Sequence, residues 1–281
     1  MIVTRFAPSP TGYLHLGHAY AAIAAQNASQ DGRFLLRIED IDLVRARPEF
    51  EAAIYEDLAW LGLRWEEPVL RQSTRFAAYR AALDRLDSQG LLYPCFCTRA
   101  EIAAEIARAS EAPHGPDGAI YPGTCRGLNA EIRAARIASG TPYALRLDIA
   151  KAARRLSALS FVEEGCGPAG EHGTIAADPL LFGDIVLARK EMPSSYHLAV
   201  VVDDAHQRVT LVTRGNDLFT ATHVQRLLQS LLELPTSHYA HHRLILDAQG
   251  RKFSKRDKAV TLRELRARGE TPQTICARFR N

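Results

Sequence analysis

The fold of this chain is set by residues 5–18, which read Arg5-Phe6-Ala7-Pro8-Ser9-Pro10-Thr11-Gly12-Tyr13-Leu14-His15-Leu16-Gly17-His18. The apolar pair before this stretch predicts a short buried strand, the proline- and glycine-containing segment predicts a tight loop, and the alanine-rich residues from Gly17 onward predict a helix. Such a helix start presents backbone N–H groups and the positive end of its dipole to an anion. The stretch therefore predicts a phosphate-binding loop at the beginning of an α/β domain.

Two short basic elements are candidates for contacts to a phosphate. His15 and His18 are three residues apart, so both imidazoles lie on the same side of the predicted helix start. The second element, Lys252-Phe253-Ser254-Lys255-Arg256, lies near the other end of the chain. Each element alone is typical of an ordinary polar turn, but the two together indicate one nucleotide site built from both ends of the sequence.

These two elements carry a resemblance to a known family. His15-Leu16-Gly17-His18 resembles the HIGH motif, and Lys252 to Arg256 resembles the KMSKS motif, of class I aminoacyl-tRNA synthetases. The string from Arg5 to Gly12 resembles the glutamyl-tRNA synthetase group of that class. Phe253 and Arg256 depart from the second motif, although both lysines and the serine are present. The resemblance implies that His15, His18, Lys252 and Lys255 are catalytic, that Mg²⁺ takes part, and that ATP is contacted by Pro8, Gly17, His18, Ser254 and Lys255.

The same resemblance implies an α/β fold in which a Rossmann-like parallel sheet is interrupted by an inserted lobe of the kind that grips the acceptor end of tRNA. A chain of 281 residues with 47% hydrophobic composition can bury a core of that size. We expect residues 1–92 to form the first half of the nucleotide-binding domain and 93–190 the inserted lobe. Residues 191–247 would form the second half, and 248–281 the lysine loop followed by two short helices.

Composition excludes some classes of protein. No apolar run approaches the length that spans a membrane, and no export segment precedes the first strand, so we expect a cytoplasmic protein without a membrane partner. A net charge of +3 permits RNA binding through local patches without demanding it. The five cysteines, an odd count, argue against a disulfide framework and favour reduced thiols or a metal site.

The pocket for the amino acid is expected beyond the ends of the parallel strands, where ligands bind in open α/β sheets. Residues 34–40 read as a second strand that ends in charged side chains, and the resemblance implies that Glu39 holds the α-ammonium of glutamate. Arginine pairs with carboxylates bidentately, which suits the two carboxylates of that substrate. By resemblance, the residues that bind L-glutamate are Arg5, Ser9, Glu39, Tyr196 and Arg214.

Further elements follow from periodicity. Apolar residues recurring on one face predict helices at 48–63 and 72–90 and a helix at 220–234, while 143–149, 209–212 and 241–246 read as strands. The near-continuous apolar run at 196–204 predicts a central parallel strand buried on both faces. The inserted lobe should therefore lie between two halves of one sheet.

Three thiols inside the expected lobe predict a structural zinc site, because thiolates hold zinc tetrahedrally. Cys95, Cys97 and Cys125 need a fourth ligand, and Tyr121, His114 and Cys166 are the candidates. General chemistry favours the histidine. The resemblance favours the phenol instead, since tRNA-modifying relatives of glutamyl-tRNA synthetase bind zinc through a Cys-x-Cys, Tyr-x-x-x-Cys pattern that matches Cys95, Cys97, Tyr121 and Cys125 position by position.

The end of the sequence favours one branch of the family. Only 25 residues follow Arg256, so we expect no anticodon-binding region. The chain resembles the short paralogues that attach glutamate to queuosine in the anticodon of tRNA(Asp), and we expect it to act as a monomer on that tRNA. The alternatives are a truncated glutamyl-tRNA synthetase that charges a tRNA 3′ end, a non-catalytic module that binds tRNA or an amino acid, and a small-molecule nucleotidylyltransferase.

Overall fold

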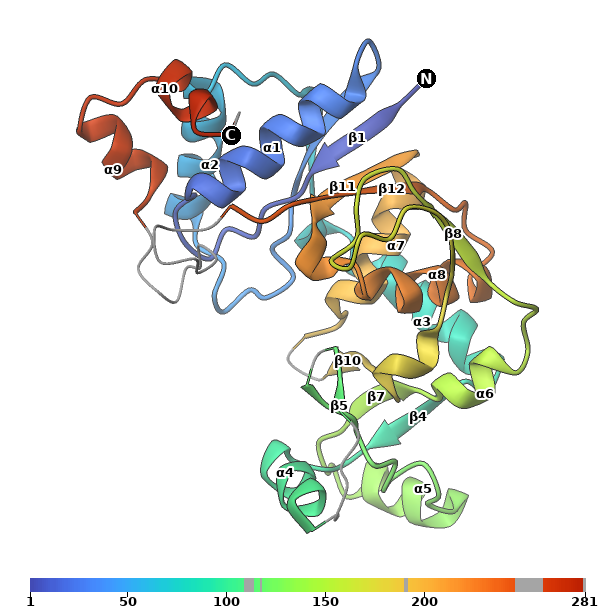
Figure 1. The fold of residues 1–281 in the computed structure, drawn as a ribbon. Coiled ribbons are helices and arrows are strands. Elements are labelled where there is room, and N and C mark those ends of the chain that lie inside the picture. The colour runs from blue at the N-terminus through green and yellow to red at the C-terminus, as the bar shows by residue number, and fades with distance from the viewer. Residues whose placement is uncertain (109–113, 117, 190–191, 246–259, 280–281) are drawn as a thin grey trace.

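A computed structural model describes residues 1–108, 114–116, 118–189, 192–245 and 260–279. The amino-terminal part is a parallel three-stranded sheet in the order β1-β2-β3, with helices connecting its strands (Figure 1). The predicted strand, loop and first helix of residues 2–18 are confirmed, as are the strand near 34–40 and the helix from 48. These elements are β1 (Val3–Phe6), α1 (Leu16–Ser29), β2 (Arg33–Ile38), α2 (Pro48–Trp60), β3 (Glu66–Arg71), η1 (Gln72–Thr74) and α3 (Phe76–Ser88).

A second sheet continues the first one. The backbone N–H of Thr210 donates to the carbonyl oxygen of Val3 at 3.0 Å, which joins the strand beginning at Leu211 to β1. The order of this sheet is β11-β12-β8-β9, in which β11, β12 and β8 are parallel. Its elements are β8 (Ser160–Glu163), β9 (Gly173–Ala176), β11 (Leu211–Gly215), η3 (Asn216–Leu218), α8 (Ala221–Leu231) and β12 (His238–His242).

The predicted strand at 196–204 is wrong, because these residues form helix α7 (Tyr196–His206). The helix packs against α3, α8 and β10, so it is buried on nearly every side. A helix surrounded in this way carries the same continuous apolar run as a central strand. Ser195 caps its start, accepting a hydrogen bond from the backbone N–H of Leu198 at 3.3 Å. The helix therefore presents Tyr196 in its first turn.

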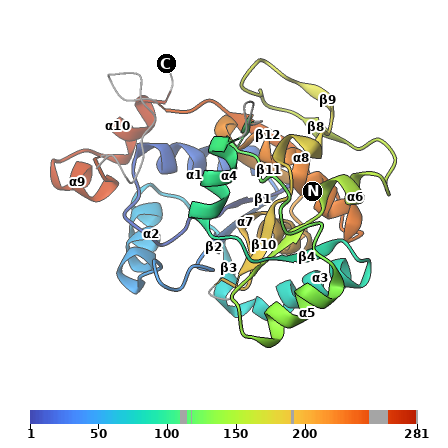
Figure 2. The same cartoon turned by 90° about the horizontal axis from the view of Figure 1, so that it is seen from below.

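The lobe lies at the opposite end of the molecule from α1 and α2 (Figure 1). A small antiparallel sheet in the order β10-β7-β4 carries it, and α4 and α5 lie at its far end (Figure 1), with the same elements seen from below in Figure 2. Strands β8 and β9 fall within residues 93–190 but join the main sheet through β12. The lobe elements are β4 (Leu92–Cys95), α4 (Arg99–Arg108), β5 (His114–Gly115), β6 (Gly118–Ala119), α5 (Ala130–Ala138), β7 (Ala144–Leu147), α6 (Ile149–Ala153), η2 (Pro179–Phe182) and β10 (Val186–Arg189).

The chain ends in the two short helices that the sequence predicts, α9 (Leu262–Ala267) and α10 (Pro272–Ala277). Leu262, Leu265 and Ile275 are buried in one apolar cluster with residues of α1 and α2, so these helices pack on the amino-terminal part (Figure 1). Among the described residues, no helix combines the length and the apolar character that crossing a membrane requires.

Candidate active site

The start of α1 carries the two predicted histidines side by side. His15 is the residue that precedes the helix, and its backbone N–H donates to Nδ1 of His18 at 3.2 Å. The two imidazole centroids are 3.8 Å apart. Because Nδ1 of His18 accepts this hydrogen bond, the ring proton belongs on Nε2, which makes that nitrogen the donor toward a ligand. The geometry at the helix start thus fits the predicted contact to phosphate.

The lysine loop lies outside the described residues, and so do Lys252, Ser254 and Lys255. The residues that follow the lysine loop contact the segment that contains His15. The backbone N–H of Leu262 donates to the carbonyl oxygen of Leu14 at 2.8 Å, and Thr261 forms an isolated β-bridge with His15. Residues from the two ends of the sequence therefore meet at the start of α1.

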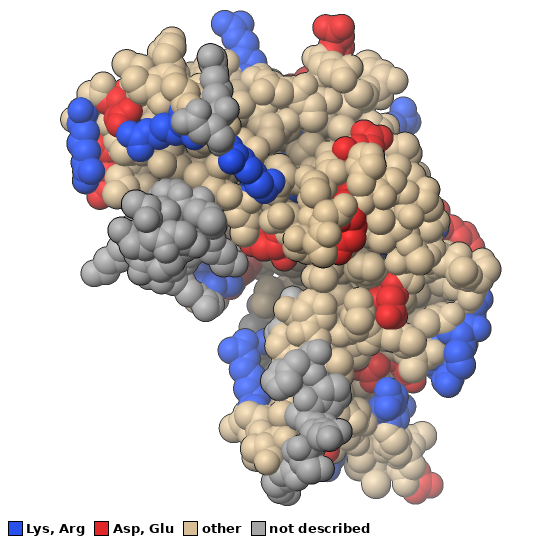
Figure 3. Space-filling model, viewed as in Figure 1, with Lys and Arg blue, Asp and Glu red and all other residues tan. Residues whose placement is uncertain are grey.

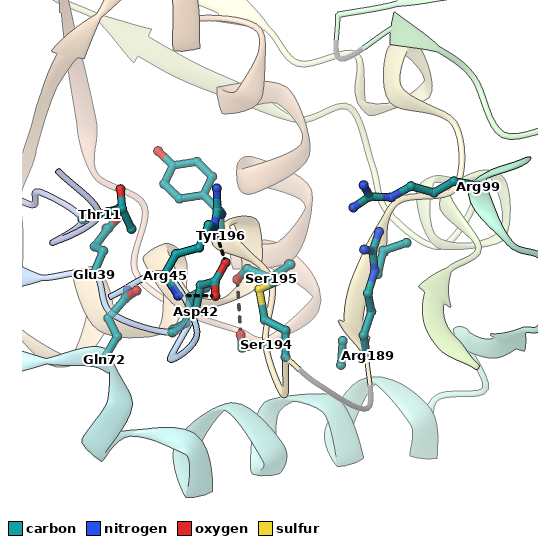
Figure 4. Close-up of a pocket in the computed structure, with 15 residues that line it drawn as sticks. Thr11, Glu39, Asp42, Arg45, Gln72, Arg99, Arg189, Ser194, Ser195 and Tyr196 are labelled. Atoms are coloured by element: carbon teal, nitrogen blue, oxygen red, sulfur yellow. Dashed lines mark hydrogen bonds and ion pairs between the residues drawn. The ribbon is translucent and has the colours of Figure 1, made fainter. Parts of the chain in front are cut away.

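A cavity of about 410 Å³ opens beyond the carboxyl ends of β1 and β2. It brings together Ser9, Glu39 and Tyr196, which the sequence predicts to bind one substrate (Figure 4). Ser9 follows β1 and Glu39 follows β2, as expected for a ligand site in an open parallel sheet. Other polar side chains that line the cavity are Thr11, Asp42, Arg45, Gln72, Arg99, Arg189, Ser194 and Ser195.

A buried cluster of charges lies behind Glu39. Asp204 accepts from Nε of Arg5 at 3.0 Å and from a terminal nitrogen of Arg37 at 2.7 Å. Burial opposes ionisation of Asp204, but the charges of Arg5 and Arg37 outweigh it and lower the pKa of this carboxyl. Burial raises the pKa of Glu39, against the pull of Arg37, whose guanidinium is 3.5 Å away. A cation that binds beside Glu39 would therefore stabilise the ionised form of its carboxyl group.

The two predicted arginines have different partners. Arg5 is paired with Asp204 and does not line the cavity, so its contact with glutamate stays a prediction. Arg214 is 6% exposed and donates to the hydroxyl of Tyr196 at 3.4 Å. This bond links Arg214 directly to the wall of the cavity, which makes it the better placed of the two for a substrate carboxylate.

The lobe contributes two arginines, Arg99 and Arg189, that no sequence motif singles out. Arg99 is the first residue of α4 and Arg189 is the last residue of β10, and both lie across the cavity from Glu39 (Figure 4). Neither side chain forms an ion pair with any residue in the described part of the chain. Figure 3 shows the molecule hollowed between the part that carries α1 and the lobe. The position of Arg99 and Arg189 at the cavity depends on how the lobe packs against the main sheet, and no local sequence pattern predicts that packing.

The predicted zinc ligands converge in the lobe. The Sγ atoms of Cys95, Cys97 and Cys125 lie within 4.8 Å of one another, and the hydroxyl of Tyr121 is 3.4 Å from Cys95 and 3.6 Å from Cys97. Tetrahedral zinc with bonds of about 2.3 Å to sulfur needs ligand separations of about 3.8 Å. The Tyr121 hydroxyl is the oxygen that the described residues bring to the three thiols, whereas the side chain of His114 lies outside the described part of the structure.

A cation and a backbone donor lie beside the Tyr121 phenol, while burial and the hydrogen bond with Cys95 raise its pKa, so a bound metal would have to displace the phenol proton. The guanidinium carbon of Arg146 is 3.8 Å from the centroid of the Tyr121 ring, and the backbone N–H of Cys125 donates to the Tyr121 oxygen at 2.8 Å. Burial raises the pKa of the Cys95 thiol, but its hydrogen bonding with Tyr121 and Arg146 outweighs that effect and lowers the pKa. The four donors thus fit a zinc ion that they would surround completely.

Comparison with known proteins agrees with this arrangement. A family model described as the catalytic domain of class I tRNA synthetases (E and Q) matches residues 1–280. The glutamyl-Q tRNA(Asp) synthetase of Rhodobacter capsulatus is 49% identical over 279 residues, which cover 98% of each chain. The protein of that name from Nocardia farcinica is 44% identical over 97% of this chain and 82% of its own length.

A solved structure shares the fold. The glutamate tRNA ligase from Elizabethkingia meningosepticum, crystallised in complex with its amino acid, superposes with a TM-score of 0.71 at 28% identity over 91% of this chain. The match covers 52% of that ligase, so the chain spans about half its length. The chain belongs to the class I tRNA synthetase family for glutamate and glutamine, and it is a ligase of the aminoacyl-tRNA synthetase type.

Proposed function

We propose that this chain activates L-glutamate with ATP and transfers it to queuosine in the anticodon of tRNA(Asp). The observation that carries the activation step is the cavity in which Ser9, Glu39 and Tyr196 meet beside the buried guanidinium of Arg214. The acceptor is supported by the R. capsulatus relative, whose name states that activity and whose length this chain matches almost completely.

Binding of glutamate follows from the charges of the pocket. Glu39 accepts hydrogen bonds from the α-ammonium, which favours the charged form of that carboxyl. Arg214 pairs with a carboxylate, and Arg5 adds positive potential from behind Asp204. Glutamine would bring a neutral amide and leave the buried Arg214 without an anionic partner, which disfavours it.

Activation is an in-line phosphoryl substitution. The α-carboxylate oxygen of glutamate attacks the α-phosphorus of ATP, the bond to the bridging oxygen breaks, and pyrophosphate leaves with the electron pair. His15, His18, Lys252 and Lys255 stabilise the negative charge on the phosphoryl oxygens. Mg²⁺, which class I synthetases use with ATP, would neutralise part of the phosphate charge. The remaining ATP contacts come from Pro8, Gly17 and Ser254.

Transfer uses the activated carbonyl. A hydroxyl of the queuosine cyclopentenediol attacks the carbonyl carbon, an ester forms, and AMP leaves with the bonding electrons while the hydroxyl loses its proton. Residues 93–190 would hold the RNA, with Arg99 and Arg189 facing the cavity from the lobe. Guanidinium groups suit phosphate oxygens because they donate two parallel hydrogen bonds.

The lobe is also where we place zinc. Cys95, Cys97, Tyr121 and Cys125 would hold Zn²⁺ as a structural ion, since protein donors fill all four positions. The ion would tie β4 to the loop that follows β6 and so fix the wall of the RNA-binding side.

A truncated synthetase that charges a tRNA 3′ end is the second candidate. It is favoured by the glutamate–tRNA ligase of Aquifex aeolicus, which is 38% identical over 98% of this chain and 55% of its own length. Both candidates require glutamate-dependent exchange of pyrophosphate into ATP, with glutamine as the control amino acid. Loss of exchange with glutamate would contradict both, and the identity of the RNA product separates them.

A further inference from the structure

Three buried side chains lie in a line behind the amino-acid pocket. Nδ1 of His241 in β12 is 2.5 Å from Oε2 of Glu163 in β8, and its Nε2 is 3.0 Å from Nε of Arg214 in β11. The side chains of Glu163 and His241 are fully buried. One histidine ring therefore bridges a carboxylate and the arginine that contacts Tyr196.

The position of the proton on this ring follows from its neighbours. Nε of an arginine always carries hydrogen and can only donate, so Nε2 of His241 must be the acceptor. The remaining ring proton is on Nδ1 and is donated to Glu163. Oε1 of Glu163 also accepts from the backbone N–H groups of His241 at 2.8 Å and Gly165 at 2.9 Å. Burial opposes the charge of Glu163, but these hydrogen bonds lower its pKa, so it stays a carboxylate.

The local backbone is built around this contact. An added Cβ at Gly165 would lie 2.3 Å from the carbonyl oxygen of His241. Only glycine lets the chain after β8 approach β12 closely enough for Glu163 to receive both backbone donors. The carboxylate is thus fixed by the sheet rather than by its own side-chain preferences.

The other partners of Arg214 are neutral. Its terminal nitrogens donate to Gln225 at 2.8 Å, to Thr222 at 2.7 Å and to Tyr196 at 3.4 Å. Within the described residues no carboxylate pairs with Arg214 directly. The negative charge of Glu163 reaches the guanidinium only through the imidazole ring, which leaves the direct anionic partner to be supplied by a ligand.

We propose that Glu163 and His241 are positioning residues that orient Arg214 for a carboxylate of the bound glutamate. The inference rests on the proposed function, because it deepens the role of Arg214 in that pocket. His241 acts here as a neutral ring, since a second ring proton would set two donors against each other at Nε2. The charged and titratable groups that face it are Glu163 from β8, Arg214 from β11, and His242 and Tyr239 within β12.

Two substitutions of the histidine separate its two nitrogens. The amide of His241→Gln reaches the position of Nε2 and restores an oxygen acceptor for Arg214. The shorter His241→Asn reaches only the position of Nδ1, so it keeps the donor to Glu163 and loses the acceptor. Steady-state pyrophosphate exchange then gives the KM for glutamate, the KM for ATP and kcat for each variant.

We expect His241→Asn to raise the KM for glutamate by about tenfold or more, because a hydrogen bond to a charged group is lost. The KM for ATP should be unchanged, and His241→Gln should recover most of the loss. Glu163→Gln should also raise the KM for glutamate. The new amide can donate to Nδ1 of His241, which lets the ring proton move to Nε2, where Arg214 needs an acceptor. Burial lowers the pKa of His241 below its ordinary value of about 6.5. In acid below that value the KM for glutamate should therefore rise more steeply in the wild type than in His241→Gln, where Glu39 still titrates but the imidazole is gone.

The chain supplies a matched control pair at the first residue of β12 and the residue that directly follows β8. His238 and Glu164 form a hydrogen bond of 2.6 Å with both side chains about half exposed. His238→Gln and Glu164→Gln should leave every kinetic constant unchanged. Equal glutamate KM values for His241→Asn, His241→Gln and the wild type would overturn the positioning role. Absence of glutamate-dependent exchange in the wild type would instead contradict the proposed function itself.

Discussion

Asp204→Asn tests the charge cluster behind the pocket. Asp204 is 5% exposed and accepts charge-assisted hydrogen bonds from Arg5 and Arg37, which are themselves buried. An asparagine keeps the shape but leaves two buried guanidinium groups with one negative charge fewer, and breaking a buried ion pair in this way costs about 3 to 5 kcal/mol.

The size of the effect on thermal unfolding follows from chain length. A chain of 281 residues has an unfolding entropy of about 0.6 kcal/mol/K, so the expected fall in Tm is about 5 to 8 °C. Scanning calorimetry at neutral pH measures it. The KM for glutamate should rise as well, because Arg5 and Arg37 lose the group that orders them beside Glu39.

An exposed ion pair provides the control. Arg33 and Glu66 are 2.7 Å apart with side chains 38% and 44% exposed, so Glu66→Gln should cost less than about 1 kcal/mol. A loss of Tm in Asp204→Asn no larger than that in Glu66→Gln would refute the assignment of Asp204 as the anchor of the two arginines.

Three further outcomes are expected. His18→Ala and Lys255→Ala should each slow pyrophosphate exchange by about 100- to 1,000-fold, the usual effect of removing one preorganised donor to a transition-state charge; an unchanged rate would remove these roles. Tyr121→Phe should lower the zinc content, measured by atomic emission after dialysis, because one of four donors is lost; full zinc retention would exclude the phenol as a ligand. Burial raises the pKa of Asp57 to about 6 from 3.8, so its contribution to stability is complete below pH 3.8 and is lost as pH rises through 6. Urea unfolding should accordingly show that Asp57→Asn gains stability over the wild type at pH 8 but not at pH 4, and equal differences at both pH values would contradict this.

Much of the site could be predicted because its signals are local. Residues 5–18 combine strand, loop and helix start within one stretch, and the structure places His15 and His18 together there. The three cysteines and Tyr121, which the sequence pattern groups together, also lie close together in the structure. Ser9, Glu39 and Tyr196 meet in one cavity because each lies close to the end of a strand or the start of a helix.

The failures have a different physical origin. The apolar run at 196–204 fits a buried strand and a buried helix equally well, and packing against α3 and α8 decides for the helix. The contact between Glu163 and His241 spans 78 residues of sequence and exists only because β8 pairs with β12. No local pattern marks either residue, since each is an ordinary polar side chain until the sheet forms. The four domain boundaries stay predictions.

The identity of the RNA acceptor is the central claim, and one assay tests it directly. The protein is mixed with ATP, labelled glutamate and two tRNA pools, one containing queuosine and one from cells that cannot make it, and the label that precipitates with RNA is counted. We predict label in the queuosine pool alone. Equal label in both pools would contradict the claim and identify a synthetase that charges a tRNA end.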